Sequence, residues 1–220
     1  MNYRLSRIAA ICGGKFSGCD SEVRSVVTDS RSLSCELGCR PMFVAMRGAN
    51  HDSHDFIAGM QSRGVRAFLV ERGVEASSCT GECGFVQVDN AIEALQRLAA
   101  YHRAQFRGTV VGITGSNGKT VIKEWIAEEL PEGMKYYRSP KSYNSQLGVP
   151  LSVLMLEGDE ELAIFEAGIS KPGEMERLER IIRPDAVIFT SIGDAHQENF
   201  INLEPVSYTH LRAHETCADL

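Results

Sequence analysis

The chain has 220 residues, of which 43% are hydrophobic, and this is enough apolar material for one large or two small globular cores. The formal net charge of -6 argues against a nucleic-acid-binding surface, which is normally basic. No apolar run approaches the length of a membrane span and no apolar leader with a cleavage site begins the chain, so we expect a cytoplasmic protein without a membrane partner.

The 7 cysteines give no strong metal signature. Two C-x₃-C pairs, Cys35/Cys39 and Cys79/Cys83, are the only arrangement that suggests zinc, and their spacing matches common zinc knuckles poorly. A chain with this much apolar material does not need a metal to fold. Reduced thiols in a cytoplasmic protein are the simpler interpretation.

Residues 1–105 are predicted to form a small α/β domain. We expect a strand at 23–27 that leads into the polar turn Thr28-Asp29-Ser30-Arg31-Ser32, and a strand at 41–46 that ends at Arg47-Gly48. The remaining elements are a helix at about 54–63, strands at 67–70 and 85–88, and a helix that Asp89 or Asn90 caps.

Residues 106–205 are predicted to form a second domain, in which strands alternate with helices. The expected strands cover 109–113, 135–137, 161–167 and 185–190, and the expected helices cover 120–130, 151–156 and 173–182. In the helix at 120–130, apolar Ile122, Trp125 and Ile126 recur at helical spacing. This alternation predicts an α/β fold with a mostly parallel sheet.

A glycine-rich loop, Gly112-Ile113-Thr114-Gly115-Ser116-Asn117-Gly118-Lys119-Thr120, joins the first strand and helix of this second domain. Glycines let backbone N–H groups converge on phosphate oxygens, and the helix N-terminus adds partial positive charge. Lys119 is placed to reach terminal phosphates and Thr120 to ligate Mg²⁺. The common form G-x-x-x-x-G-K-[ST] has glycine where this chain has Ile113. The loop therefore predicts nucleotide binding with an unusual glycine spacing.

Two further residues fall where ligands gather in such folds. Glu166 ends an almost wholly apolar strand, and a buried carboxylate needs a partner, for which a metal ion is a natural candidate. His196 follows the next strand by a few residues. Because ligands bind beyond the carboxyl ends of parallel strands, we expect Glu166 and His196 to lie near the phosphate loop. The plainer interpretations are a salt-bridged structural acid and a surface histidine.

These segments together resemble the Mur ligases of peptidoglycan synthesis, over roughly residues 20–204. Within the family the chain is most similar to the members that add D-alanyl-D-alanine to UDP-N-acetylmuramoyl-tripeptide, in the form fused to an alanine racemase. The resemblance rests on seven segments: Thr28–Ser32, Met42–Gly48, Gly112–Thr120, Ser142–Pro150, Phe165–Gly168 with Lys171–Glu174, Arg183–Asp185 and Ile192–His196. It also accounts for the glycine spacing of the loop.

The resemblance implies a role for each site residue. In the first domain, Ser30, Arg31 and Arg47 would contact the UDP part of the substrate. In the second domain, the loop Gly115-Ser116-Asn117-Gly118 with Lys119 would hold the phosphates of ATP, Thr120 and Glu166 would hold Mg²⁺, and His196 would help to hold a second Mg²⁺. Asn144 and Ser145 would line the path of the muramoyl peptide. The catalytic set would be Lys119, Glu166 and His196.

The chain also departs from the family. A complete ligase would be about twice as long, so we expect a fragment that is inactive alone and, as a folded species, monomeric. Residues 206–220, from Val206 through His210, His214 and Cys217, resemble adaptor read-through rather than this family, and we expect them to be a non-native tail. A metal site at H-x₃-H-x₂-C is the functional alternative for this tail.

Other classes remain open from the sequence. The ligase that adds the third peptide residue and folylpolyglutamate synthase share the phosphate loop, but Asn144–Pro150 and the Asp29-Ser30-Arg31 turn fit the D-alanyl-D-alanine ligase better. A kinase or a regulatory nucleotide switch would not have the UDP-type first domain. A non-catalytic fragment that retains affinity for a UDP-sugar is the third possibility.

Overall fold

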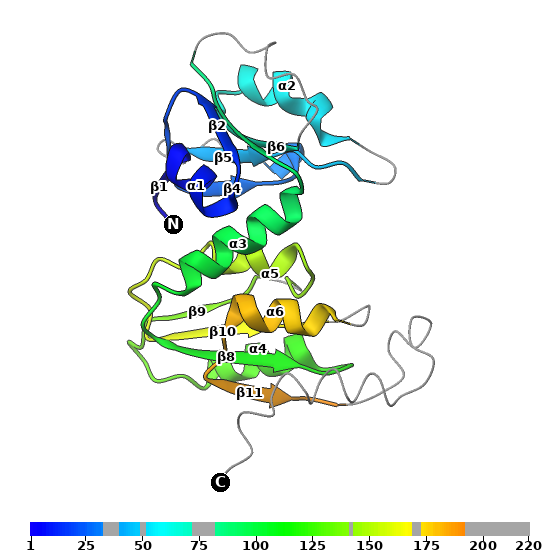
Figure 1. Ribbon diagram of the computed structural model, residues 1–220. Coiled ribbons are helices and arrows are strands. Elements are labelled where there is room, and N and C mark those ends of the chain that lie inside the picture. Colours follow the sequence, from blue (N-terminus) through cyan, green and yellow to red (C-terminus); the bar gives the residue numbers. More distant parts are fainter. Residues whose placement is uncertain (33–39, 49–51, 72–81, 141–142, 169–172, 192–220) are drawn as a thin grey trace, which may run out of the picture. The chain divides into compact units, whose positions relative to one another are not determined.

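The computed structural model describes residues 1–32, 40–48, 52–71, 82–140, 143–168 and 173–191 (Figure 1). The chain divides into two compact units, Met1–Tyr101 and His102–Leu220, and the division falls inside helix α3 (Ala91–Arg103). Both units mix helices with mostly parallel strands, so the predicted α/β class is confirmed. The ligands assigned above to each domain stay predictions. None of the described helices is long and apolar enough to cross a membrane.

The first unit is built on a five-stranded sheet in the order β2-β7-β6-β5-β4. Strands β4 to β7 pair in parallel, and β2 joins β7 in antiparallel fashion. The strands are β2 (Lys15–Gly18), β4 (Ser25–Val27), β5 (Pro41–Val44), β6 (Ala67–Glu71) and β7 (Gly84–Val88). A short antiparallel pair, β1 (Tyr3–Arg4) with β3 (Glu22–Val23), lies apart from this sheet.

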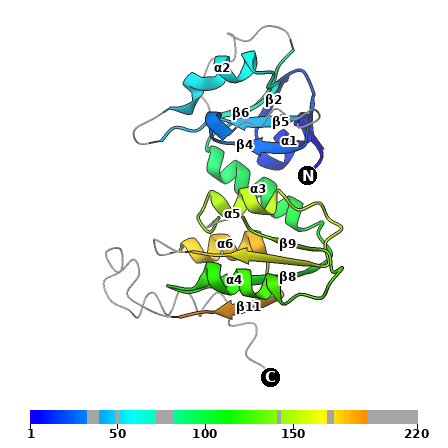
Figure 2. The same cartoon turned by 180° about the vertical axis from the view of Figure 1, so that it is seen from behind.

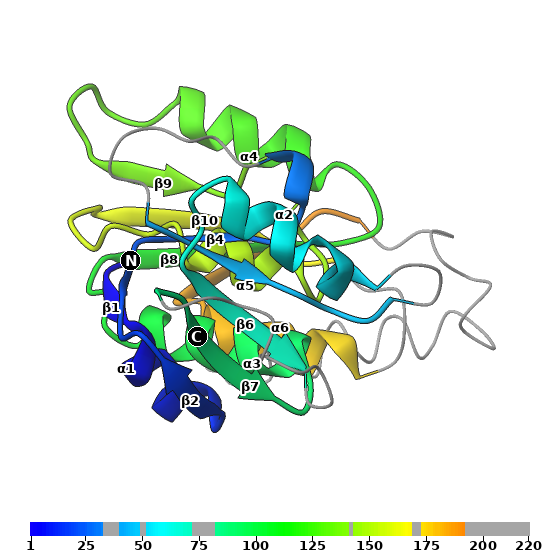
Figure 3. The same ribbon diagram turned by 90° about the horizontal axis from the view of Figure 1, so that it is seen from above.

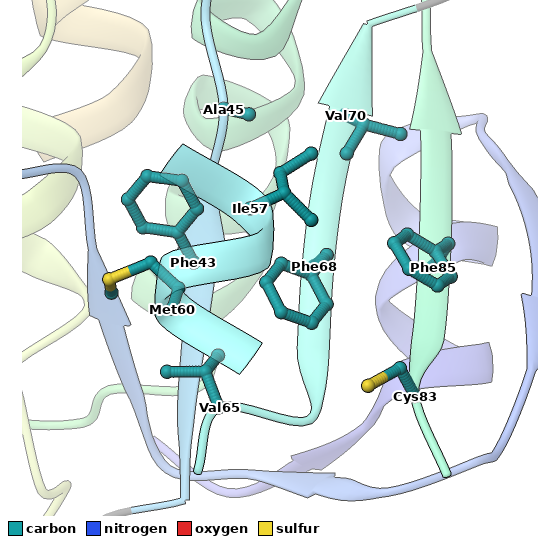
Figure 4. Close-up of a cluster of buried hydrophobic side chains, with 9 residues drawn as sticks. All are labelled: Phe43, Ala45, Ile57, Met60, Val65, Phe68, Val70, Cys83 and Phe85. Carbon is teal, nitrogen blue, oxygen red and sulfur yellow. The ribbon is translucent and has the colours of Figure 1, made fainter. Parts of the chain in front are cut away.

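One buried hydrophobic cluster of the first unit lies between the sheet and helix α2 (Ile57–Ser62), which follows a 3₁₀ turn, Ser53–Phe56. Figure 4 shows Ile57 and Met60 of α2 above the rings of Phe43 and Phe68. The rings of Phe68 and Phe85 stack at 5.2 Å between centroids. Alternation along β5 and β6 places every second side chain on this covered face, which is why these short strands are rich in aromatic and branched residues.

Helix α1 (Leu5–Cys12) and strands β1 and β2 of the first unit were not predicted. Helix α1 buries Leu5, Ile8 and Cys12, and strand β2 follows it. Gly13 ends the helix in the left-handed conformation at φ 70°. The predicted strand at 23–27 is in fact two strands, β3 and β4, in different sheets.

The second unit has a parallel four-stranded sheet in the order β11-β8-β10-β9. The strands are β8 (Thr109–Thr114), β9 (Tyr136–Arg138), β10 (Leu162–Glu166) and β11 (Ala186–Phe189). Helix α4 (Lys119–Glu128) covers one face, and α5 (Gly148–Val153) and α6 (Glu174–Ile182) cover the other (Figures 2 and 3). The predicted elements of this unit are thus present, with ends that shift by one to three residues.

Strand alternation decides which helix each side chain meets. Ile113 and Ile164 face α4 and pack with Ile122 and Ile126. Trp125, which shares the helical spacing of Ile122 and Ile126, is instead 63% exposed. Helical periodicity alone therefore did not identify the buried face of α4, because both faces carry apolar residues.

Filling a small cavity should stabilise the second unit. Gly112 in β8 lines an apolar cavity of about 20 Å³, and a Cβ there would lie 3.4 Å from Pro184 and 3.9 Å from Val187, which is ordinary contact. We expect Gly112→Ala to raise the free energy of unfolding by about 0.4–1 kcal/mol and Tm by about 1–4 °C. Gly133→Ala is the control, because Gly133 has a φ of +87° that strains alanine. A lower Tm for Gly112→Ala contradicts the prediction.

Tyr137 should make stability depend on pH at the alkaline end. Burial raises the pKa of its phenol from 10.0 to about 12, while the hydroxyl donates to the carbonyl of Ser152 at 2.8 Å. The unfolded chain ionises first, so stability is complete below pH 10.0 and falls as the pH rises toward 12. Tyr137→Phe should be less stable at pH 8 by about 1 kcal/mol, and its deficit should shrink by pH 11 in urea unfolding. A deficit that does not change with pH contradicts this assignment.

Candidate functional site

The phosphate loop runs from the end of β8 to the start of α4. Gly118 is the residue before α4 and takes the left-handed conformation at φ 85°, and Gly115 has a φ of 130°. As Gly118 has no side chain, nothing from that residue caps the first N–H groups of the helix, which leaves them available to an anion. The two glycines thus adopt backbone conformations that L side chains rarely take, at the start of a helix.

Residues after β11 hold this loop in place. The N–H of Ser116 donates to the carbonyl of Ser191 at 2.8 Å, and the Thr190 hydroxyl donates to the carbonyl of Asn117 at 2.5 Å. A Cβ at Gly115 would lie only 2.2 Å from Thr190 Oγ1. Glycine at 115 is therefore required by close packing as well as by its φ angle.

The Lys119 side chain folds back over the loop. Its Nζ donates to the carbonyl of Gly115 at 2.5 Å and of Ser116 at 3.4 Å. Burial lowers the pKa of this ammonium, and the charge of Glu166 acts in the opposite direction. Lys119 is thus held at the loop by carbonyls, in a place from which it can turn to a phosphate oxygen.

Glu166 ends β10 on the face that α4 covers, and its side chain is 0% exposed. Its Oε2 accepts a hydrogen bond from the Thr120 hydroxyl at 3.1 Å. Its Oε1 lies 2.8 Å from Lys123 Nζ, although it accepts no hydrogen bond of good geometry from the described residues, so this contact is a close ion pair. The sequence thus correctly placed Glu166 beside Thr120 and the loop.

Lys123 is the buried charged residue beside this site that the sequence reasoning missed. Its side chain is 0% exposed, and its Nζ also donates to the carbonyl of Ser139 at 2.6 Å. The available signal was its position one turn after Thr120 on the same face of the helix, opposite a buried acid that needed a cation. A buried protein cation is therefore already one partner of Glu166.

Thr120 and Glu166 fit a magnesium ion by the chemistry of their donors. A hydroxyl and a carboxylate oxygen lie 3.1 Å apart, and both are hard oxygen ligands of the kind that Mg²⁺ prefers. These residues would hold the ion next to the phosphate loop. His196, the third predicted ligand, lies outside the described residues, and no cluster of three or more metal-ligating side chains occurs within the part of the chain that is described. Cys35, Cys39 and Cys79 also fall outside it.

Asn144 and Ser145 have structural contacts near the same strand end. The carbonyl of Asn144 accepts from the N–H of Gly168 at 2.8 Å, two residues beyond Glu166. The Ser145 hydroxyl accepts from the N–H of Gly148 at 3.0 Å, where α5 begins. Asn144 is thus close to the predicted site, whereas Ser145 serves the local fold, and a role in peptide binding stays a prediction for both.

The residues that are predicted to contact UDP lie at one edge of the sheet in the first unit. Ser30 and Arg31 follow β4, and Arg47 follows β5, which is parallel to β4 and adjacent to it. Arg31 donates to both carboxylate oxygens of Asp29 at 3.0 and 2.9 Å, and these bonds hold the pKa of Asp29 at about 2. Arg31 is 89% exposed, so its guanidinium is open to a ligand.

A buried histidine supports the Arg47 side of this edge, and the sequence reasoning described it only as part of a loop. His54 Nε2 accepts from the N–H of Glu71 at 3.1 Å, so Nδ1 carries the proton and donates to Asp52. The other oxygen of Asp52 lies 3.4 Å from Arg47 Nε. Asp52 also caps the 3₁₀ turn through the N–H of His54.

The loop, the buried acid and the parallel sheet form the strand–loop–helix arrangement that α/β proteins with a nucleotide-phosphate site use. The profile of the Mur ligase middle domain matches residues 113–217, a range that includes most of the segment predicted to be a tail. The chain belongs to the Mur ligase family.

Individual relatives agree. The chain is 34% identical to the UDP-N-acetylmuramoyl-tripeptide–D-alanyl-D-alanine ligase of Borreliella burgdorferi, covering 88% of this chain and 44% of that protein. It is 32% identical to the ligase of the same name from Escherichia coli, covering 94% of this chain and 44% of that protein. The chain therefore spans less than half the length of these relatives.

Solved structures show the same fold. A crystal structure of MurF from Acinetobacter baumannii matches 95% of this chain and 45% of its own with a TM-score of 0.83 at 27% identity. MurF ligase from Thermotoga maritima in complex with ADP matches 87% of this chain and 43% of its own, with a TM-score of 0.74 at 32% identity.

The two loop glycines should differ sharply in their tolerance of a methyl group. Gly115→Ala adds both φ strain and a clash with Thr190, so we expect a loss of about 3 kcal/mol and of about 6–12 °C in Tm. Gly118→Ala adds strain alone, because its nearest neighbour to a Cβ lies at 4.0 Å, and should cost about 1–2 kcal/mol. Thermal unfolding compares the two, and equal losses would show that packing against Thr190 is unimportant.

Proposed function

We propose that this chain is part of an ATP-dependent ligase that joins D-alanyl-D-alanine to UDP-N-acetylmuramoyl-tripeptide. The observation that carries the proposal is the phosphate loop with Thr120 and Glu166 in contact beside it. The named ligases to which the chain is similar supply the substrates. The first unit would bind the UDP part through Ser30, Arg31 and Arg47.

The proposed chemistry has two steps. The γ-phosphoryl group of ATP passes to the terminal carboxylate of the tripeptide, which gives an acyl phosphate and ADP. The amine of D-alanyl-D-alanine then attacks the acyl carbon, the amide forms and inorganic phosphate leaves. Neither step needs a nucleophile from the protein, which agrees with a loop and charged groups rather than a catalytic triad.

The residues of the second unit would act by position and charge. The loop N–H groups and Lys119 would hold the phosphate oxygens, and Thr120 and Glu166 would hold Mg²⁺, with His196 assigned to a second ion. Bound Mg²⁺ would neutralise charge that develops on the phosphate oxygens. Asn144, with Ser145 at the start of α5, would lie along the path of the peptide. A cytoplasmic, monomeric protein also remains part of the proposal.

Calorimetric titration with ADP and MgCl₂ tests the nucleotide site. We expect the chain to bind MgADP and Lys119→Met to bind it about 10–100-fold more weakly, since a charge-assisted hydrogen bond is worth about 1.5–3 kcal/mol. Lys135→Met is the matched control, because Lys135 lies at the surface and pairs with Asp159. A chain that binds no MgADP, or a Lys119→Met variant of unchanged affinity, contradicts the proposal.

Titration with UDP-N-acetylmuramoyl-tripeptide separates the competing classes. A ligase and a non-catalytic UDP-sugar-binding fragment should both bind it more tightly than UDP, whereas a kinase or a nucleotide switch should bind neither. Amide formation from ATP, this tripeptide and D-alanyl-D-alanine then distinguishes the first two. We expect none from the 220-residue chain alone, and turnover would show that this expectation is wrong.

A further inference from the structure

In the buried pair formed by Lys123 and Glu166, the two oxygens of the carboxylate have different partners. Both side chains are 0% exposed, and one carboxylate oxygen, Oε1, lies 2.8 Å from the ammonium. The other, Oε2, accepts from the Thr120 hydroxyl. Only Oε2 is therefore on the side of the phosphate loop, and a cation that entered there would meet one carboxylate oxygen rather than two.

Lys123 is itself anchored, so it can fix the carboxylate. Its Nζ donates to the carbonyl of Ser139 at 2.6 Å, and the Ser139 hydroxyl accepts from the N–H of Glu166 at 3.4 Å. Ser139 directly follows β9, which is paired in parallel with β10. The ammonium and the backbone of Glu166 are thus tied to the same residue, and the orientation of the carboxylate is set before any ligand arrives.

Among the residues that the structure describes, the charge balance around this carboxylate is positive. Lys119 and Lys123 carry two positive charges against the one negative charge of Glu166. The next acid, Glu124, lies 3.6 Å from Lys123 Nζ but is also paired with Arg138 at the surface. Charges in a buried site are poorly screened by water. The excess positive charge therefore weakens the binding of a divalent cation on its own, whereas it attracts phosphate groups.

We propose that Lys123 is a positioning residue that neutralises and orients Glu166, so that Mg²⁺ binds only together with the nucleotide phosphates. This inference rests on the proposed function, because it assigns Thr120 and Glu166 to magnesium. Lys123 would thereby make the metal site depend on the nucleotide and would keep it from filling with free divalent cations.

Thermal unfolding of the full chain, followed by circular dichroism, tests this inference. The chain is heated in NaCl, in millimolar MgCl₂ at matched ionic strength, and in MgCl₂ with ADP. We expect Tm of the unchanged chain to rise with MgADP but not with MgCl₂ alone. In Lys123→Gln the side chain stays polar but the charge is gone, so MgCl₂ alone should raise Tm by about 2–4 °C.

Two further variants separate charge from structure. Lys123→Arg keeps the positive charge, so MgCl₂ alone should leave its Tm unchanged, as it does for the unchanged chain. The double variant Lys123→Gln/Glu166→Gln has no carboxylate at this site, so MgCl₂ alone should leave its Tm unchanged as well. A purely structural role for Lys123 would lower Tm in Lys123→Gln without creating a response to MgCl₂, and this result overturns the inference.

The remaining outcomes are also decisive. A rise in Tm of the unchanged chain with MgCl₂ alone, equal to that of Lys123→Gln, overturns the inference. If Lys123→Gln is unfolded in NaCl, folding on addition of MgCl₂ supports it and failure to fold at every MgCl₂ concentration overturns it. If the unchanged chain does not respond to MgADP, the proposed nucleotide site itself fails, which is a separate result.

Discussion

The second unit depends on the burial of one carboxylate. Taking Glu166 out of water costs several kcal/mol unless a cation or hydrogen-bond donors meet it, and the structure supplies both from one turn of α4. Thr120 and Lys123 can serve because Gly118 starts the helix directly beside the end of β8. The parallel register of β8 with β10 then brings Glu166 level with Ile113, just before the loop. Loop, helix and sheet order are all needed to satisfy this single charge.

The first unit uses the same geometry for a different set of groups. The segments that follow β4 and β5 lie at one edge because those strands are parallel and adjacent. The edge carries Arg31 and Arg47 at its surface, and the Asp52–His54 pair lies behind Arg47. In both units polar chemistry is thus confined to strand ends, while the strands themselves bury apolar side chains.

Most elements could be predicted because their signals are local. The glycine loop, the helix that follows it and the strand that ends at Glu166 are all contained in short windows of sequence. Lys123 was not assigned, because its partner Glu166 lies on a separate strand, β10, and strand order is not readable from alternation. Trp125 shows the same limit: its helical spacing matched that of Ile122, yet only the packing decides which face is covered. Helix α1 was missed because it has only 8 residues, although Leu5, Ile8, Ala9 and Cys12 form an unbroken apolar stripe at helical spacing.

The exposure of Trp125 has a spectroscopic consequence. The chain contains a single tryptophan, and in the folded state its ring is 63% exposed. Its fluorescence therefore starts from a water-like environment and reports on α4 alone, two residues from Lys123 but on the opposite face. Collisional quenchers should reach the ring while the fold is intact. Emission wavelength is consequently a poor measure of unfolding for this chain, whereas backbone circular dichroism follows both units.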